Sequence, residues 1–236
     1  MEREAGQLPA GHAGRSMDWI WYGSKGRVLV MLPTSGGRQN ENEDFGLTKV
    51  LEPLIHAGEL QVVCVDSLNR ESWGKDDLMP EQKLRLQGNY DRFLVHEFFP
   101  FVAAKSGRHD PALYGASLGG WQAVTFAARY PHLVKRVIAF SGFFDLRRIT
   151  KDWFGGESYF FSPLDFISNM DASWVARLSQ VEWVVATGDG DSLVEETRRL
   201  AAVLRQKGIP HHAEIWPGVF GHDWPFWKQH LPRFLP

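Results

Sequence analysis

The chain has 236 residues, of which 44% are hydrophobic and 23% charged, as is typical of one folded domain with a sizeable core. The net charge of −2 gives no reason to expect nucleic acid or an anionic membrane surface as a partner. No apolar run reaches the roughly 18 residues that a membrane span needs, so we expect no transmembrane helix.

The N-terminal residues 1–16 are rich in Gly, Ala and charged side chains, and we expect a loose tail before a single domain over residues 17–236. The tail contains no apolar stretch typical of a secretory signal, which favours a cytoplasmic location. Two β-prone runs follow, Asp18–Tyr22 and Arg27–Leu32, joined by the turn Gly23-Ser-Lys-Gly26. This pattern predicts a β-hairpin that leads into the sheet.

The next segments alternate between helix and strand patterns. Residues 47–56 have helically spaced apolar side chains, and residues 61–65 form a continuous β-prone run typical of a strand covered on both faces. This run contains Cys64, the single cysteine, so an internal disulfide is excluded and we expect a core side chain. Residues 80–105 predict a helix that is broken near Gly88.

A short motif comes next, Gly115-Ala-Ser117-Leu-Gly119, which has the Gly-x-Ser-x-Gly pattern of a nucleophile elbow. The two glycines leave room for a sharp backbone turn that presents the serine side chain. An apolar stretch at residues 112–114 precedes the motif, and a helical pattern at residues 121–129 follows it. Because the motif requires a strand, a turn and a helix in this order, Ser117 is the candidate nucleophile.

The C-terminal half continues the alternation, with strands expected at residues 137–140, from Val181 onward and at residues 213–216, and a helix at residues 195–207. The first two of these strands are separated by roughly forty residues rich in Phe and Trp, too few for a cap domain. Strands that alternate with helices predict an α/β fold with a mostly parallel central sheet, helices on both faces and a minimal cap.

A serine hydroxyl is a poor nucleophile unless a base removes its proton and a carboxylate orients that base. In hydrolases that work this way, the chain order is Ser, then an acid, then His. Nine histidines are present, but only His222 follows the last expected strand on a Gly-rich loop. Since parallel strands gather their chemistry in the loops at their ends, His222 is the candidate base.

Three aspartates compete for the role of orienting acid. Asp145 follows the strand at residues 137–140, a position that some hydrolases use. Asp189 lies within a glycine turn, where short polar side chains often bond the local backbone. Asp191 lies at the entry to the helix near Glu195, where it could also serve as an N-cap.

Three motifs together resemble the α/β-hydrolase superfamily, namely Gly-Ala-Ser117-Leu-Gly-Gly, Thr187-Gly-x-x-Asp191 and Gly221-His222-Asp-Trp224. Within it, the chain is most similar to the esterase group of S-formylglutathione hydrolases, siderophore esterases and mycolyltransferases, over about residues 17–235. The resemblance implies the α/β-hydrolase fold and, through the Gly-x-x-Asp spacing, favours Asp191 as the acid that orients His222.

The same mechanism needs N–H groups that bind the oxyanion. The residue after the nucleophile, Leu118, should supply one, and the loop after the second expected strand should supply another, from Thr34 or Ser35. Here the chain departs from the resemblance, because many relatives carry His-Gly where this chain has Leu32-Pro33-Thr34-Ser35-Gly36-Gly37.

Ten tryptophans are more than a chain of this size usually carries. Packing is the ordinary role of such residues, and the alternative is an aromatic-walled substrate cleft. Four lie in or beside expected strand-end loops and are the candidates for substrate binding: Trp73, Trp121, Trp153 and Trp224.

These observations favour a serine esterase that hydrolyses carboxylic esters through an acyl-enzyme. The alternatives are an acyltransferase that uses the same three residues with an alcohol acceptor, and a non-catalytic binding module on the same fold. The expected partner is a small-molecule ester, and the oligomeric state is left open. No Cys/His cluster has metal-ligand spacing, so we expect neither a metal nor a cofactor.

Overall fold

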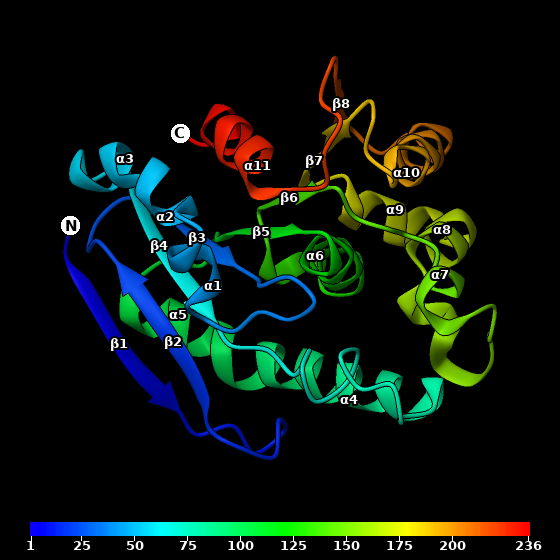
Figure 1. Cartoon of the computed structure of the whole chain (residues 1–236), viewed down its shortest axis with the longest axis horizontal. Coiled ribbons are helices and arrows are strands. Elements are labelled where there is room, and N and C mark those ends of the chain that lie inside the picture. The colour runs from blue at the N-terminus through cyan, green and yellow to red at the C-terminus, as the bar shows by residue number, and fades with distance from the viewer.

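The computed structural model describes residues 1–236 and contains one central sheet of eight strands (Figure 1). In chain order the strands are β1 (Arg3–Leu8), β2 (Met17–Tyr22), β3 (Arg27–Met31), β4 (Leu60–Val65), β5 (Ala112–Ala116), β6 (Arg136–Phe140), β7 (Glu182–Gly188) and β8 (His211–Trp216). Their spatial order is β1-β2-β4-β3-β5-β6-β7-β8, and every neighbouring pair from β4 to β8 is parallel. The predicted mostly parallel sheet is therefore confirmed.

The N-terminal edge of the sheet differs from the prediction in two ways. Residues 3–8 are not a loose tail but the edge strand β1, which pairs antiparallel with β2. Their side chains are mostly exposed, so this edge strand carries no apolar pattern that would reveal it. The predicted hairpin of β2 and β3 is also wrong, because β4 lies between them and pairs with both. Every residue of β4 is buried, and only a central position in the sheet buries a strand so completely.

Helices pack on both faces of the sheet, as predicted. One face is covered by α4 (Pro80–Phe93), α5 (Phe99–Ser106), α6 (Leu118–Arg129) and α10 (Val194–Gln206), and the other by α2 (Leu47–Val50), α3 (Glu52–His56) and α11 (Trp224–His230). Successive side chains of β3 divide between the two cores: Val28 and Val30 join the first, and Leu29 and Met31 the second. No helix has both the length and the apolar character of a membrane span.

The long helix expected at residues 80–105 is interrupted at a different place. Gly88 lies inside α4, and the break is instead the π-helical turn η1 (Leu94–Phe98) between α4 and α5. Pro100 follows within the first turn of α5 and has no N–H to donate to the preceding turn, which explains the irregularity at this point. Pro53 likewise lies at the start of α3, where the segment expected as one helix divides into α2 and α3.

The segment between β6 and β7 forms only short helices. These are α7 (Arg147–Thr150), η3 (Gly156–Phe161), α8 (Pro163–Phe166), η4 (Ile167–Asn169) and α9 (Ala172–Leu178). Figure 1 places α7, α8 and α9 in yellow-green at one side of the molecule, beside α6. The segment is thus a minimal cap, as predicted. The other short elements are α1 (Glu41–Asp44), η2 (Pro131–Leu133) and η5 (Leu231–Phe234).

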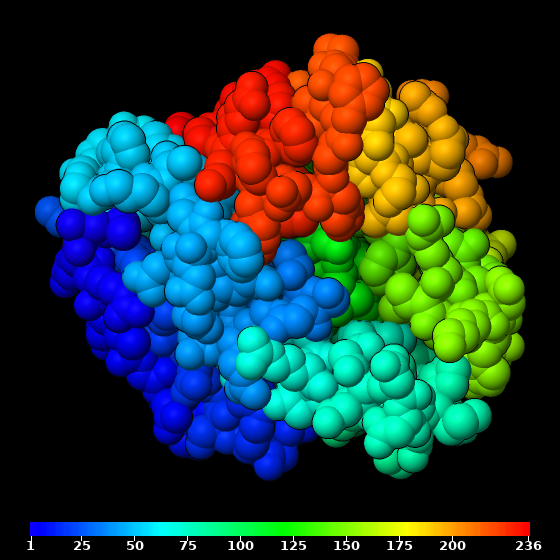
Figure 2. Space-filling model, viewed as in Figure 1, coloured from blue at the N-terminus to red at the C-terminus, as the bar shows by residue number.

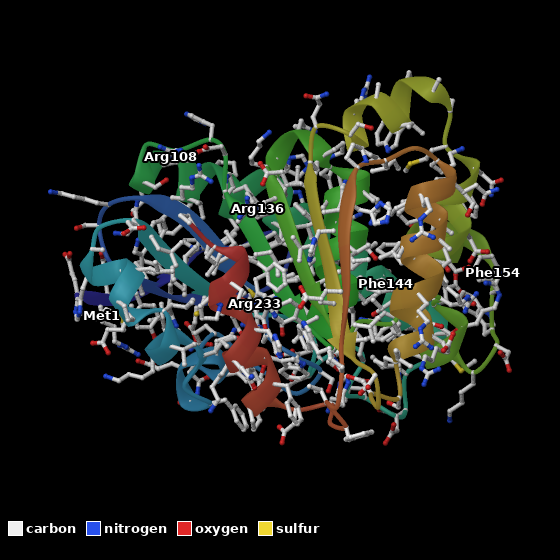
Figure 3. All side chains as sticks on the ribbon, turned by 90° about the horizontal axis from the view of Figure 1, so that it is seen from above. Met1, Arg108, Arg136, Phe144, Phe154 and Arg233 are labelled. Carbon is white, nitrogen blue, oxygen red and sulfur yellow. The ribbon has the colours of Figure 1, made fainter.

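The loops that follow the parallel strands all lie at the carboxyl ends of those strands, on one side of the sheet. In Figure 3, Arg108, which precedes β5, and Arg136, the first residue of β6, mark the edge where these strands begin. The loops that follow β5, β7 and β8 leave from the opposite edge, because the three strands run in the same direction. The sheet therefore brings together three loops that are far apart in the sequence.

Candidate active site

The first of these loops is the turn between β5 and α6. Ser117 has φ 56° and ψ −123°, a conformation that a residue with a side chain rarely adopts. A side chain at Gly115 would overlap the carbonyl oxygen of Gly119, so only glycine allows β5 and α6 to approach so closely. The N–H of Ser117 donates to the Phe140 carbonyl of β6 at 2.9 Å, which ties the turn to the sheet. This is the strained strand-turn-helix geometry that the motif predicts.

The loops after β7 and β8 bring Asp191 and His222 to this serine. His222 Nε2 lies 2.9 Å from Ser117 Oγ, and His222 Nδ1 lies 3.1 and 3.2 Å from the two carboxylate oxygens of Asp191. An ionised carboxylate can only accept, so Nδ1 must be the donor, which leaves Nε2 of a neutral imidazole to accept from the Ser117 hydroxyl. The structure thus brings the three residues together in the order Ser117, His222, Asp191.

The Asp191 carboxylate is buried and lies among hydrogen-bond donors. Burial alone would raise its pKa, but hydrogen bonds from His222, from the Leu193 N–H and from Ser141 outweigh that effect and hold the pKa of Asp191 below its ordinary value. The Leu193 N–H donates to Oδ1 at 2.8 Å. The carboxylate therefore stays ionised beside His222 and also supports the chain where it enters α10.

The other two aspartates make different contacts. Asp189 accepts from the N–H groups of Gly218 and Val219 at 2.9 and 3.1 Å, and so braces the loop that leads to His222. Asp145 pairs with Arg147 and Arg199 on the cap side. Neither carboxylate has a hydrogen bond to His222, so Asp191 is the aspartate that contacts this imidazole.

The loop after β3 contains the two residues predicted to supply an oxyanion donor. The N–H of Thr34 donates to Glu41 Oε2 at 2.6 Å, and its hydroxyl donates to Glu41 Oε1 at 2.8 Å. The Glu41 carboxylate of α1 already accepts the Thr34 N–H, so Thr34 has no N–H free for an oxyanion. This corrects the prediction that either Thr34 or Ser35 could supply the second donor. Ser35 is exposed, and its N–H is the remaining candidate. Leu118 begins α6, where the first N–H groups have no partner within the helix.

Of the four tryptophans predicted to bind substrate, Trp121 is a core residue instead. It is 0% exposed, stacks on Phe143, and donates its Nε1 proton to the Phe161 carbonyl at 2.8 Å. Because α6 turns this face toward the cap helices, Trp121 cannot line a cleft. Trp73 and Trp153 are partly buried and pack against the same cluster.

The fourth tryptophan, Trp224, lies two residues after His222 at the start of α11. Its ring stacks on Phe45, with centroids 4.6 Å apart and planes inclined by 4°. Phe45 is 49% exposed, so this aromatic pair forms part of the surface beside His222.

Two further side chains support the site without having been predicted. The ring of Trp227 meets His222 edge-on at 5.4 Å, and its Nε1 donates to Ser141 Oγ at 3.1 Å. Ser141 has φ 50° and lies at the end of β6, beside Asp191. In the sequence, Trp227 belongs to an ordinary amphipathic helix and Ser141 to a loop, so neither carries a local signal of its place.

The candidate site lies in a hollow on the molecular surface. In Figure 2, green surface from the segment around residues 110–125 is recessed between blue surface of the loop after β3 and orange-red surface of the loop after β8. The His222 side chain, on the loop after β8, is 32% exposed. No group of three or more His, Cys, Asp or Glu side chains is arranged to hold a metal ion.

Comparisons with known proteins identify the family and the fold of the chain. The family described as "Putative esterase" matches residues 14–236. A search of curated protein sequences finds no match.

Solved structures resemble the chain over nearly its whole length. A ferulic acid esterase is 21% identical with a TM-score of 0.80, covering 100% of this chain and 96% of its own. An S-formylglutathione hydrolase of Staphylococcus aureus is 14% identical with a TM-score of 0.72, covering 99% of this chain and 94% of its own. MPT51 of Mycobacterium tuberculosis is 17% identical with a TM-score of 0.69, covering 99% of this chain and 96% of its own. These proteins share the fold of this chain.

Proposed function

Since the chain belongs to the "Putative esterase" family of carboxylic ester hydrolases and has the α/β-hydrolase fold, we propose that Ser117, His222 and Asp191 hydrolyse esters by way of an acyl-enzyme. The observation that carries the proposal is the 2.9 Å contact between His222 Nε2 and Ser117 Oγ, made while Nδ1 faces Asp191. Nucleophile, base and orienting acid within hydrogen-bond reach of one another are the arrangement that serine hydrolysis requires.

In the first half-reaction, Ser117 Oγ attacks the ester carbonyl carbon and its proton passes to His222 Nε2. The negative charge that develops on the carbonyl oxygen is stabilised by the N–H groups of Leu118 and Ser35. The intermediate then collapses with cleavage of the bond to the alcohol oxygen, which takes the proton from His222 and leaves. Asp191 stabilises the imidazolium throughout and holds its orientation.

In the second half-reaction, water takes the place of the alcohol. His222 removes a proton from the water while its oxygen attacks the acyl carbon, and the proton then passes to Ser117 Oγ as the carboxylic acid departs. The 32% exposure of His222 supports hydrolysis over transfer to an alcohol, because water can reach the base directly. An acyltransferase would need to shield the acyl-enzyme from water.

The shape around the site supports small esters as substrates. The cap consists of short helices beside α6, and the hollow in Figure 2 is open. The aromatic pair of Phe45 and Trp224 offers a flat apolar surface near His222. We therefore expect turnover of short-chain or aromatic acyl esters to exceed that of emulsified long-chain triglycerides.

The test combines covalent labelling with a substrate panel. A fluorophosphonate should modify Ser117, and mass spectrometry should find the adduct on the peptide that contains it. Wild type should hydrolyse esters of varied acyl length, whereas folded Ser117→Ala should not. An adduct on Ser35 or Ser141 would show that the nucleophile is another residue. Full turnover by Ser117→Ala would exclude the mechanism.

A further inference from the structure

The loop that offers the second oxyanion donor is held from both sides at Thr34. On one side, Glu41 accepts from the Thr34 N–H at 2.6 Å and from the Thr34 hydroxyl at 2.8 Å. On the other, Asn69 Nδ2 donates to the Thr34 carbonyl at 2.8 Å. Glu41 comes from α1 and Asn69 from the segment after β4, and within the loop the Gly37 N–H also donates to the Thr34 carbonyl at 3.2 Å.

These contacts fix the orientation of two successive peptide planes. Each peptide group is planar and trans, so its N–H and C=O point in opposite directions. The Thr34 carbonyl shares a plane with the Ser35 N–H. The shorter hydrogen bond from Asn69, at 2.8 Å, and the turn bond from the Gly37 N–H, at 3.2 Å, together set the direction of this plane, and Asn69 is the side chain that does so. The Thr34 N–H shares a plane with the Pro33 carbonyl, and Glu41 sets the orientation of that plane.

The held peptides lie directly against the turn that carries the nucleophile. A Cβ atom at Gly119 would lie 2.6 Å from the Pro33 carbonyl oxygen and 3.3 Å from that of Leu32. The loop backbone is therefore in contact with the first turn of α6, two residues after Ser117. At this distance, a rotation of either peptide plane would change where the Ser35 N–H points relative to an oxyanion formed on the substrate.

Asn69 is itself held by a buried chain of amides. Its Oδ1 accepts from Gln122 Nε2 at 2.8 Å, and the same Nε2 donates to Gln87 Oε1 at 2.8 Å. Since Oδ1 is engaged by a donor, Nδ2 must be the atom that faces the Thr34 carbonyl. Asn69, Gln122 and Gln87 are all at most 3% exposed, and buried amides are costly unless they are paired.

The Glu41 carboxylate is also partly buried, which disfavours its ionised form. Burial raises the pKa of its carboxyl above the ordinary value, although Thr34 donates two hydrogen bonds to it and Arg70 is nearby. The neighbouring Glu43 in α1 instead forms an ion pair with Arg3 at the surface. Glu41 and Glu43 of this short helix thus have different surroundings, and of the two only Glu41 contacts Thr34.

We propose that Glu41 and Asn69 are positioning residues that hold the peptide planes on either side of Thr34 and so aim the Ser35 N–H at the oxyanion. The inference rests on the proposed serine esterase function and adds the residues that preorganise its second oxyanion donor. An oxyanion site must be oriented before the reaction, because reorientation during catalysis would cost part of the stabilisation it supplies.

The test compares Glu41→Ala and Asn69→Asp with matched controls. Asp at position 69 keeps the size of the side chain but sets a carboxylate oxygen against the Thr34 carbonyl. We expect kcat to fall roughly 10- to 100-fold in both variants with KM within about twofold, since the oxyanion forms only in the transition state. Glu41→Gln should recover most of kcat, because its amide can accept from the Thr34 N–H and donate to the Thr34 hydroxyl. The controls Glu43→Ala and Asn89→Ala should match wild type, because Glu43 pairs with Arg3 and Asn89, in α4, accepts a hydrogen bond from Arg92.

A second readout separates aiming from general weakening of the fold. A thionoester places sulfur where the carbonyl oxygen would be, and sulfur is a weak hydrogen-bond acceptor. An oriented N–H therefore favours the oxoester, and the ratio of oxoester to thionoester turnover should fall in Glu41→Ala and Asn69→Asp. Normal kcat in both variants, or a lowered kcat with an unchanged ratio, would overturn the proposal. Activity in Ser117→Ala would instead overturn the underlying mechanism, so the two failures are distinguishable.

Discussion

Replacing Asp191 by Asn tests which carboxylate orients His222. The Leu193 N–H donates to Asp191 Oδ1 at 2.8 Å, so the amide oxygen of the new side chain would take that place. Its NH2 group would then face His222 Nδ1, where the carboxylate now accepts. Two donors cannot pair, and the imidazole would adopt the tautomer with its proton on Nε2. In that state His222 cannot take the proton of Ser117.

The expected loss of kcat is large. A change to the wrong tautomer in a triad costs about four orders of magnitude, or about 5.4 kcal/mol of barrier at about 1.36 kcal/mol per factor of ten. By contrast, Asp189→Asn keeps one acceptor for the N–H groups of Gly218 and Val219, so its kcat should stay within about threefold of wild type.

The assay measures kcat and KM on a short-chain ester for Asp191→Asn, Asp189→Asn and Asp145→Asn, with circular dichroism to establish that each variant is folded. All three change one charge and almost no volume, so they control for one another. Retention of most turnover by Asp191→Asn, together with loss in either of the other two, would refute the assignment. The assignments of Ser117 as nucleophile and His222 as base would stand in that case.

Three further outcomes are expected. Ser117→Gly should be more stable than Ser117→Ala by about 1 kcal/mol, or about 2–4 °C in Tm. Both variants lack the hydroxyl, and only glycine relieves the backbone strain at φ 56°. Equal Tm values would mean that the turn is not strained. Gly119→Ala should lower kcat at least tenfold, roughly the effect of a misplaced catalytic group, because its methyl group would meet the Pro33 carbonyl at 2.6 Å; unchanged kinetics would argue against close packing of loop and turn. The lowered pKa of Asp191 means that its ionised form stabilises the fold above its ordinary value of 3.8 and that this stability is lost as pH falls through the lower native value. Urea unfolding should therefore separate wild type from Asp191→Asn more at pH 5 than at pH 3, and a constant gap would contradict that sign.

Much of the arrangement followed from local patterns in the sequence. The Gly-x-Ser-x-Gly motif predicted the strained turn at Ser117, because the steric limits on a tight turn act within a few residues. Alternating apolar runs predicted the parallel sheet, and parallel strands send their following loops to one edge. The chain order then indicated His222 as the base beside Ser117, and the Gly-x-x-Asp spacing of the family that the chain resembles favoured Asp191 as the acid beside His222.

Other features depended on contacts between residues far apart in the chain, which no local pattern encodes. The position of β4 between β2 and β3 depends on the burial of both its faces, which only a central strand can achieve. The edge strand β1 pairs with β2 alone and is mostly exposed, so its formation depends on that pairing and not on an apolar pattern. Trp121 is a core residue because the cap helices cover that side of α6. Thr34 and Ser35 were equivalent candidates in the sequence, and only the fold brings Glu41 to the Thr34 N–H and Asn69 to its carbonyl. Because each N–H and C=O takes the partner that packing places nearest, the tertiary structure decided which backbone group stays free for the oxyanion.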